Sequence, residues 1–155
     1  MVPKKILFCT DFSDNSRPAW GLAVDYAKAF DAQLLVLHVI DHKNLPGYVD
    51  WAERLREMLG DIERAAQERL QSMVKGCGLA AKDLKVYCRR GMTSKEIVSL
   101  AQEESVDLIV VGSHGWTGMK DLVVGSVARS VLKTAHRPVL VVDASSGQGE
   151  ASKGL

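Results

Sequence analysis

The chain has 155 residues, of which 46% are hydrophobic and 25% are charged, and a formal net charge of +1. These values are typical of one soluble domain with its own core. The small net charge gives no general attraction for nucleic acid, and the sequence has no basic stripe with interleaved aromatic residues. No apolar run reaches the roughly 20 residues that span a membrane, and the run at 6–9 is too short for a signal peptide. We therefore expect a cytoplasmic protein with no nucleic-acid partner and no membrane insertion.

The first part of the chain predicts a strand, a helix and a second strand. The apolar run at 5–9 is followed by Asp11 and then, at 13–16, by hydroxyl, carboxyl and amide side chains that are typical of a helix N-terminus. Apolar residues then recur at helical spacing, with Pro18 in the first turn, where a missing amide costs little. The nearly continuous apolar run at 34–40 predicts a parallel strand that is buried on both faces.

The middle of the chain predicts a loop, a long helix and a weaker strand. Asparagine, proline and glycine at 41–48 indicate a loop, and apolar residues at 51–73 keep a helical period. The alternating pattern at 84–89 predicts a strand at an edge of the sheet. Thr93 with Glu96 three residues later has the pattern of a capping box, which predicts the start of another helix.

The last part of the chain predicts two strands joined by a helix. A strongly apolar run at 107–111 leads directly into glycines, a short helix begins at Ser126, and the run at 139–142 predicts the final strand. The tail at 144–155 has no periodic apolar pattern and is predicted to be disordered. Residues 1–143 are thus expected to form a single domain.

Five strands that alternate with four helices predict an α/β fold. The expected architecture is an open five-stranded parallel sheet with right-handed crossovers and helices on both faces. In such sheets a ligand binds beyond the carboxyl ends of the strands, where the strand order reverses. The candidate site residues all follow a predicted strand or begin a predicted helix.

The strongest functional pattern is the glycine-containing segment after the fourth strand. Gly112 and Gly115 would let the backbone approach phosphate groups, and Gly125 with Ser126 would supply amides and a hydroxyl at a helix N-terminus, which favours anions. The alternative is that each glycine only makes a turn. His114 could contact phosphate, or it could simply be solvated on the loop.

Two residues at the ends of other strands complete the candidate site. The Asp11 carboxylate could accept hydrogen bonds from a ribose or adenine group, and the backbone of Val39 could bond an adenine edge. Asp11 could instead only cap the following helix or bond the neighbouring turn. His38, Asp41 and His42 lie close in sequence, but a strand places His38 and Asp41 on opposite faces, so no metal site is expected.

The chain contains no pattern that predicts efficient catalysis. It has no GxxxxGK[ST] phosphate-binding loop, no GxSxG nucleophile turn and no carboxylate pair at a catalytic spacing. Binding of a nucleotide is therefore favoured over its turnover, and whether the protein is an enzyme stays open. The alternatives are a slow ATP-hydrolysing or phosphotransfer enzyme and a dimeric interaction module that holds no nucleotide.

The segments named above resemble the universal stress proteins, whose ATP-binding members carry glycine, two residues, glycine, nine residues, and glycine with serine or threonine. Gly112, Gly115, Gly125 and Ser126 match that spacing, while Trp116 departs from the polar or basic residue usual at its position. The resemblance also covers 6–13, 37–39, 107–115 and 137–142.

The resemblance implies strand order 3-2-1-4-5 and a regulatory or stress-response protein. It implies a bound adenine nucleotide, either ATP or AMP/ADP, with Mg²⁺ on the phosphates. It also implies a homodimer through Val139 to Val142 and a protein partner that the sequence does not identify. The residues that match the nucleotide contacts of the family are Thr10, Asp11, Val39, Gly112, His114, Gly115, Gly125, Ser126 and Val127.

Overall fold

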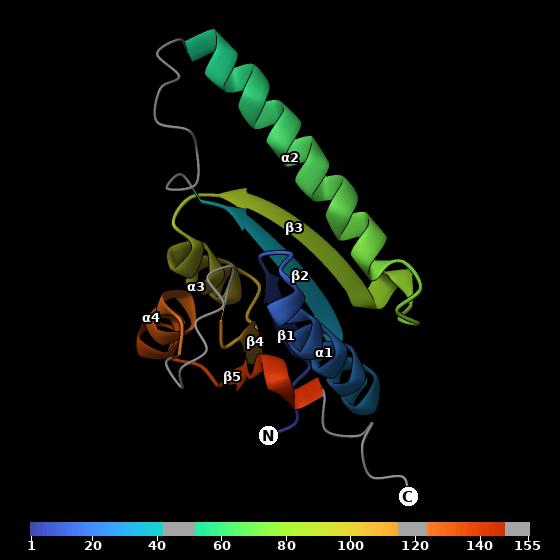
Figure 1. Ribbon diagram of the computed structural model, residues 1–155. Helices are drawn as coiled ribbons and strands as arrows, with labels where there is room; N and C mark the ends of the chain where they lie inside the picture. The colour runs from blue at the N-terminus through green and yellow to red at the C-terminus, as the bar shows by residue number, and fades with distance from the viewer. Residues whose placement is uncertain (42–51, 115–123, 148–155) are drawn as a thin grey trace, which may run out of the picture.

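The computed structural model describes residues 1–41, 52–114 and 124–147. A five-stranded parallel sheet forms the middle of the molecule, with strand order β3-β2-β1-β4-β5 (Figure 1). The strands are β1 (Lys5–Thr10), β2 (Gln33–Ile40), β3 (Leu84–Arg90), β4 (Leu108–Gly112) and β5 (Val139–Val142). This confirms the predicted fold class and strand order, including the edge position of β3.

Helices cover both faces of the sheet, as predicted. The described parts of the chain contain the α-helices α1 (Arg17–Phe30), α2 (Ala52–Val74), α3 (Thr93–Glu103) and α4 (Ser126–Thr134). Short 3-10 helices lie at Asp14–Ser16, Ala81–Asp83 and Ala144–Gly147. Helices α1 and α2 lie on one face of the sheet, and α3 and α4 lie on the other.

Alternate residues of the central strands enter two separate hydrophobic clusters. Ile6 and Phe8 of β1 pack with α1 and the end of α2, whereas Leu7 between them packs with α3 and α4. All three side chains are completely buried. The two clusters explain why the central strands have continuous apolar runs: side chains on both faces of a parallel strand are covered by helices.

The long helix α2 is attached to the body mainly through its C-terminal half. Its buried residues among those described are Ala66, Leu70 and Val74. Arg90 at the end of β3 also forms an ion pair with Glu63 of α2. In Figure 1 the N-terminal half of α2 extends away from the sheet.

The structure corrects several predicted details. The fourth strand occupies 108–112 rather than 107–111, and the third extends from Leu84 to Arg90. The capping box was wrong: Met92 is the N-cap residue of α3, and the Thr93 hydroxyl donates instead to Asp41. The predicted tail begins with the 3-10 helix at Ala144–Gly147, and the rest of it lies outside the described residues, as does most of the predicted loop at 41–48.

Candidate functional site

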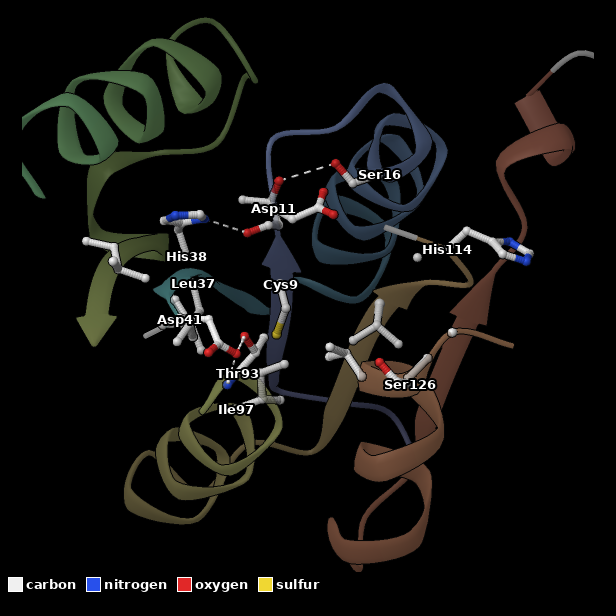
Figure 2. A pocket seen from close by; sticks show the side chains of 18 of the residues that line it. Cys9, Asp11, Ser16, Leu37, His38, Asp41, Thr93, Ile97, His114 and Ser126 are labelled. Atoms are coloured by element: carbon white, nitrogen blue, oxygen red, sulfur yellow. Dashed lines mark hydrogen bonds between the residues drawn. The ribbon is translucent and has the colours of Figure 1, made fainter. Parts of the chain in front are cut away.

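A cavity of about 420 Å³ opens at the carboxyl ends of β1, β2 and β4, where the strand order reverses (Figure 2). The beginnings of α3 and α4 close its other sides. The cavity lining includes the predicted site residues Thr10, Asp11, Val39, Gly112, His114, Gly125, Ser126 and Val127. Gly115 lies outside the described residues, together with Trp116. Residues from four separate segments of the sequence therefore meet at one site.

Asp11 is held at the cavity wall by a tight turn. Its Oδ1 atom accepts hydrogen bonds from the Ser13 amide at 2.9 Å and from the Ser13 hydroxyl at 2.6 Å. This local bonding is the alternative role that the sequence left open for Asp11. Because the turn fixes the carboxylate beside the cavity, the structural role and a ligand role are compatible.

His38 lines the cavity as well, although the sequence suggested it only as a metal ligand. Its Nδ1 atom lies 2.9 Å from the carbonyl oxygen of Thr10, and since a carbonyl only accepts, Nδ1 carries the proton. Burial lowers the pKa of His38 below its usual value of 6.5, and the hydrogen bond to Thr10 opposes this effect. The ring is therefore neutral near pH 7 and braces the end of β1.

The segment after β4 is shaped by close backbone contacts. The Ser113 amide donates to Val142 of β5 at 2.8 Å, and the Gly125 amide donates to the Ser113 carbonyl at 2.7 Å. A Cβ atom on Gly125 would lie 3.0 Å from that carbonyl oxygen, whereas one on Gly112 would meet only ordinary contacts at 3.5 Å or more. The Gly125 amide thus stabilises the turn before α4 through the Ser113 carbonyl.

Ser126 and Val127 begin α4 beside the cavity (Figure 2). The first amides of a helix have no acceptor within the helix, so this N-terminus attracts anions.

The His114 ring lies apart from Asp11 and Ser126 in Figure 2, on the side of the C-terminal strand. Its Nδ1 atom is 2.8 Å from the Ser113 hydroxyl, and its buried Nε2 atom has no hydrogen-bond partner within the described parts of the chain.

The other side of the cavity is apolar. Leu37, Ile97 and Val111 contribute side chains that are nearly or completely buried. Cys9 also lies there, and burial raises the pKa of its thiol, which stays protonated. The cavity thus combines an apolar wall with a helix N-terminus and a carboxylate.

Asp41 closes the rim of the cavity by binding the start of α3. Its Oδ2 atom accepts hydrogen bonds from the Thr93 hydroxyl at 3.0 Å and from the Thr93 amide at 3.4 Å. This role of Asp41 was not predicted from the sequence, although Asp41 follows β2 as Asp11 follows β1, which was the available signal. Thr93 had been assigned to a cap of its own helix.

In residues 1–41, 52–114 and 124–147, no group of three or more histidine, cysteine, aspartate or glutamate side chains could hold a metal ion. His42, the third residue of the metal reading, lies outside these ranges. Among the described helices, none is long and apolar enough to span a membrane.

The chain was compared with protein families, curated proteins and solved structures. The model of the universal stress protein family matches residues 3–143. Universal stress protein MJ0531 of Methanocaldococcus jannaschii is 37% identical over 142 residues, which cover 90% of this chain and 81% of that protein.

Two solved structures have the same fold. The hypothetical protein MJ0577 of Methanocaldococcus jannaschii has a TM-score of 0.71 at 32% identity, over 92% of this chain and 96% of that one. A universal stress protein from Archaeoglobus fulgidus in complex with dAMP has a TM-score of 0.61 at 22% identity, over 92% of this chain and 100% of that one. The family model, the identity to MJ0531 and the shared fold lead to one conclusion: the chain belongs to the universal stress protein family.

Proposed function

We propose that the cavity at the strand switch binds an adenine nucleotide, ATP or AMP/ADP, and that the protein acts as a regulatory module in a stress response. One observation carries the proposal: every predicted contact residue that lies in the described parts of the chain lines the same cavity. Its volume, about 420 Å³, is within the usual range for small-molecule sites.

The chemistry of the two walls suits the two ends of a nucleotide. The apolar wall around Leu37 and Ile97 would bury the adenine ring, and the backbone of Val39 would bond its edge. Asp11 would accept hydrogen bonds from the ribose, while the N-terminus of α4 at Ser126 and Val127 would favour the phosphates. Mg²⁺ would arrive with the phosphates of ATP, because the described residues include no metal-binding cluster. A universal stress protein of the same fold that binds dAMP is consistent with this reading.

The proposed cellular setting follows from the same reading. We place the protein in the cytoplasm as a homodimer that pairs through β5 and transmits the nucleotide state to a protein partner. In the described part of the chain, strand β5 lies at an edge of the sheet and pairs with β4 on one side. The backbone groups on its other side are therefore available for pairing.

The direct test is equilibrium titration of the purified protein with ATP, ADP and AMP, each with and without Mg²⁺, by calorimetry. We expect saturable binding at submillimolar nucleotide and tighter ATP binding with Mg²⁺. If binding does not saturate below about 1 mM, the binding free energy is weaker than about 4 kcal/mol, and the nucleotide site is rejected. The interaction module without nucleotide would then be the remaining reading.

A turnover assay distinguishes the enzymatic alternative. Sustained release of phosphate over many turnovers, abolished by Ser126→Ala, would assign a phosphotransfer or hydrolytic function to the same cavity. Binding without such turnover supports the regulatory proposal.

A further inference from the structure

A second cavity, of about 780 Å³, lies between the segment that follows β1 and the helix α2. Residues 10–20 form one side and residues 65–73 form the other. Thr10 and Ser16 line both this cavity and the proposed nucleotide site. None of the residues that the family resemblance assigns to the nucleotide lines it except Thr10, so it is a separate space with its own chemistry.

One residue that lines this second cavity, Phe12, is aromatic and has an unusual backbone conformation. Phe12 has φ of +64°, a region that bulky side chains rarely adopt and that often marks a functional site. Its amide donates to the Thr10 hydroxyl at 2.9 Å, which fixes this conformation. The Phe12 ring stacks near the His38 ring, with centroids 4.3 Å apart. Trp20 contributes a second, half-buried aromatic side chain.

Two arginines, one from α1 and one from α2, line the same cavity. Arg69 of α2 lies over the Phe12 ring, with its Cζ atom 4.3 Å from the ring centroid. Arg17 of α1 also lines the cavity and forms an ion pair with Asp14 at 3.1 Å. Both side chains of this pair are more than 80% exposed. Such an exposed pair is weak, so Arg17 can exchange its partner for a ligand. The arginines are suited to hold a planar anionic group in two-point contacts.

We infer that this second cavity binds a small aromatic monoanion: a flat, apolar ring system that carries one carboxylate. The ring would pack against the Trp20 indole and the edge of the Phe12 ring, because His38 and Arg69 already cover the two faces of Phe12. The carboxylate would lie between Arg17 and Arg69. Glu68 also lines the cavity, and its negative charge disfavours ligands with several charges, such as nucleotides. The two cavities therefore select different ligands, although they share the wall at Thr10 and Ser16.

The test uses the full-length protein labelled with ¹⁵N at the tryptophan indoles, and 2-naphthoate as the probe. The indole resonance of Trp20 is assigned with Trp20→Phe and followed by NMR during the titration. We expect a saturable shift of this resonance, and we expect Arg69→Gln to weaken the apparent affinity about tenfold, with a smaller loss for Arg17→Gln. 2-Naphthamide, which has the same ring without the charge, should bind much more weakly.

The matched control is Arg64→Gln, which removes an exposed arginine of the same helix that is paired with Asp61 and does not line the cavity. This variant should bind 2-naphthoate as the unchanged protein does. Equal affinities in Arg69→Gln and Arg64→Gln would overturn the proposal. They would mean that the probe binds away from Arg69, for example in the first cavity. A Trp20 resonance that does not saturate, or equal binding of 2-naphthamide, would overturn it as well.

Discussion

The imidazole of His38 shows how one buried side chain makes the region of the site sensitive to pH. It donates to the Thr10 carbonyl and stacks near Phe12, so both proposed cavities border residues that it contacts. Burial lowers the pKa of His38 below 6.5 in the folded protein. Well above pH 6.5 the ring is neutral in both the folded and the unfolded chain, and its hydrogen bond to Thr10 is made without protonation.

This shift predicts that stability falls as the pH drops below about 6.5. In that range the unfolded chain takes up a proton at His38 that the folded protein resists, so acid favours unfolding until the pH reaches the lowered folded pKa. Urea unfolding between about pH 7.5 and 5.5 measures the effect. His38→Gln should reduce the loss of stability on acidification.

The matched control for this prediction is His136→Asn, which removes an exposed histidine in a left-handed conformation that asparagine tolerates. This variant should keep the pH dependence of the unchanged protein. If His38→Gln and His136→Asn had the same pH dependence, the effect would not arise from the buried ring.

At Gly125 the structure gives a steric reason for having no side chain, because the nearest atom belongs to the backbone. A Cβ atom would lie 3.0 Å from the carbonyl oxygen of Ser113, a backbone atom that cannot rotate away. We expect Gly125→Val to shift the turn before α4 and to weaken nucleotide binding at least about tenfold, or about 1.4 kcal/mol. Calorimetric titration with ATP measures this.

Two other glycine substitutions make this prediction specific. Gly60→Ala adds a Cβ atom with nothing within 4 Å and should leave binding unchanged. Gly112→Ala meets only ordinary protein contacts, so a loss of binding without loss of stability would show that the ligand itself needs that space. Unchanged affinity in a well-folded Gly125→Val protein would contradict the role proposed for this turn.

At the scale of elements, α2 differs from the other helices because one short stretch fixes it to the sheet. Leu70 is completely buried, whereas Leu59 on the same helix is only half-buried. Residues of α2 line both cavities, with Ile62 at the first and Arg69 at the second. The position of this helix therefore affects the shape of both sites.

We expect Leu70→Ala to lower the free energy of unfolding by about 2–5 kcal/mol, because it leaves a void in the core. The matched substitution Leu59→Ala should cost about 1 kcal/mol, since less apolar surface is lost. Glu63→Gln, which breaks the partly exposed ion pair with Arg90, should cost less than about 1 kcal/mol. Equal losses for the two leucine variants in urea unfolding would show that α2 is anchored along its whole length.

At the scale of the whole molecule, β5 presents a strand edge that suits pairing with a second copy. The carbonyl of Pro138 accepts a hydrogen bond from Ile109 of β4 at 3.0 Å, and that of Val142 accepts one from Ser113, just after β4, at 2.8 Å. Backbone groups alternate in direction along a strand, so the amides of Val139 and Val141 point to the other edge. Strand order places β5 last in the described sheet.

This alternation allows a substitution that affects only the outer edge. We expect Val141→Pro to remove an amide that faces the partner and to convert a dimer into a monomer, while the β4 ladder and the fold persist. Sedimentation measures the mass, and circular dichroism checks the fold. A Val141→Pro protein that folds and stays dimeric would place the interface elsewhere, and a monomeric unchanged protein would reject the dimer.

The sequence by itself determined the α/β fold, because continuous apolar runs separated by amphipathic helices are stable only as a parallel sheet covered on both faces. It also predicted that Asp11, Val39 and Gly112 would meet at one place, since the carboxyl ends of parallel strands lie at one edge of a sheet, and these three residues line the same cavity. It misjudged Thr93, because a capping pattern depends on which residue actually begins the helix.

Only the tertiary structure decided which partners the polar groups of the site take. The Gly125 amide binds Ser113, the Asp41 carboxylate binds Thr93, and His38 binds Thr10, and the last two contacts join residues far apart along the chain. The second cavity also depends on the tertiary structure, because it forms where α2 packs beside the segment after β1. Sequence periodicity reports which face of an element is buried, whereas hydrogen bonds and cavities depend on how elements from distant parts of the chain meet.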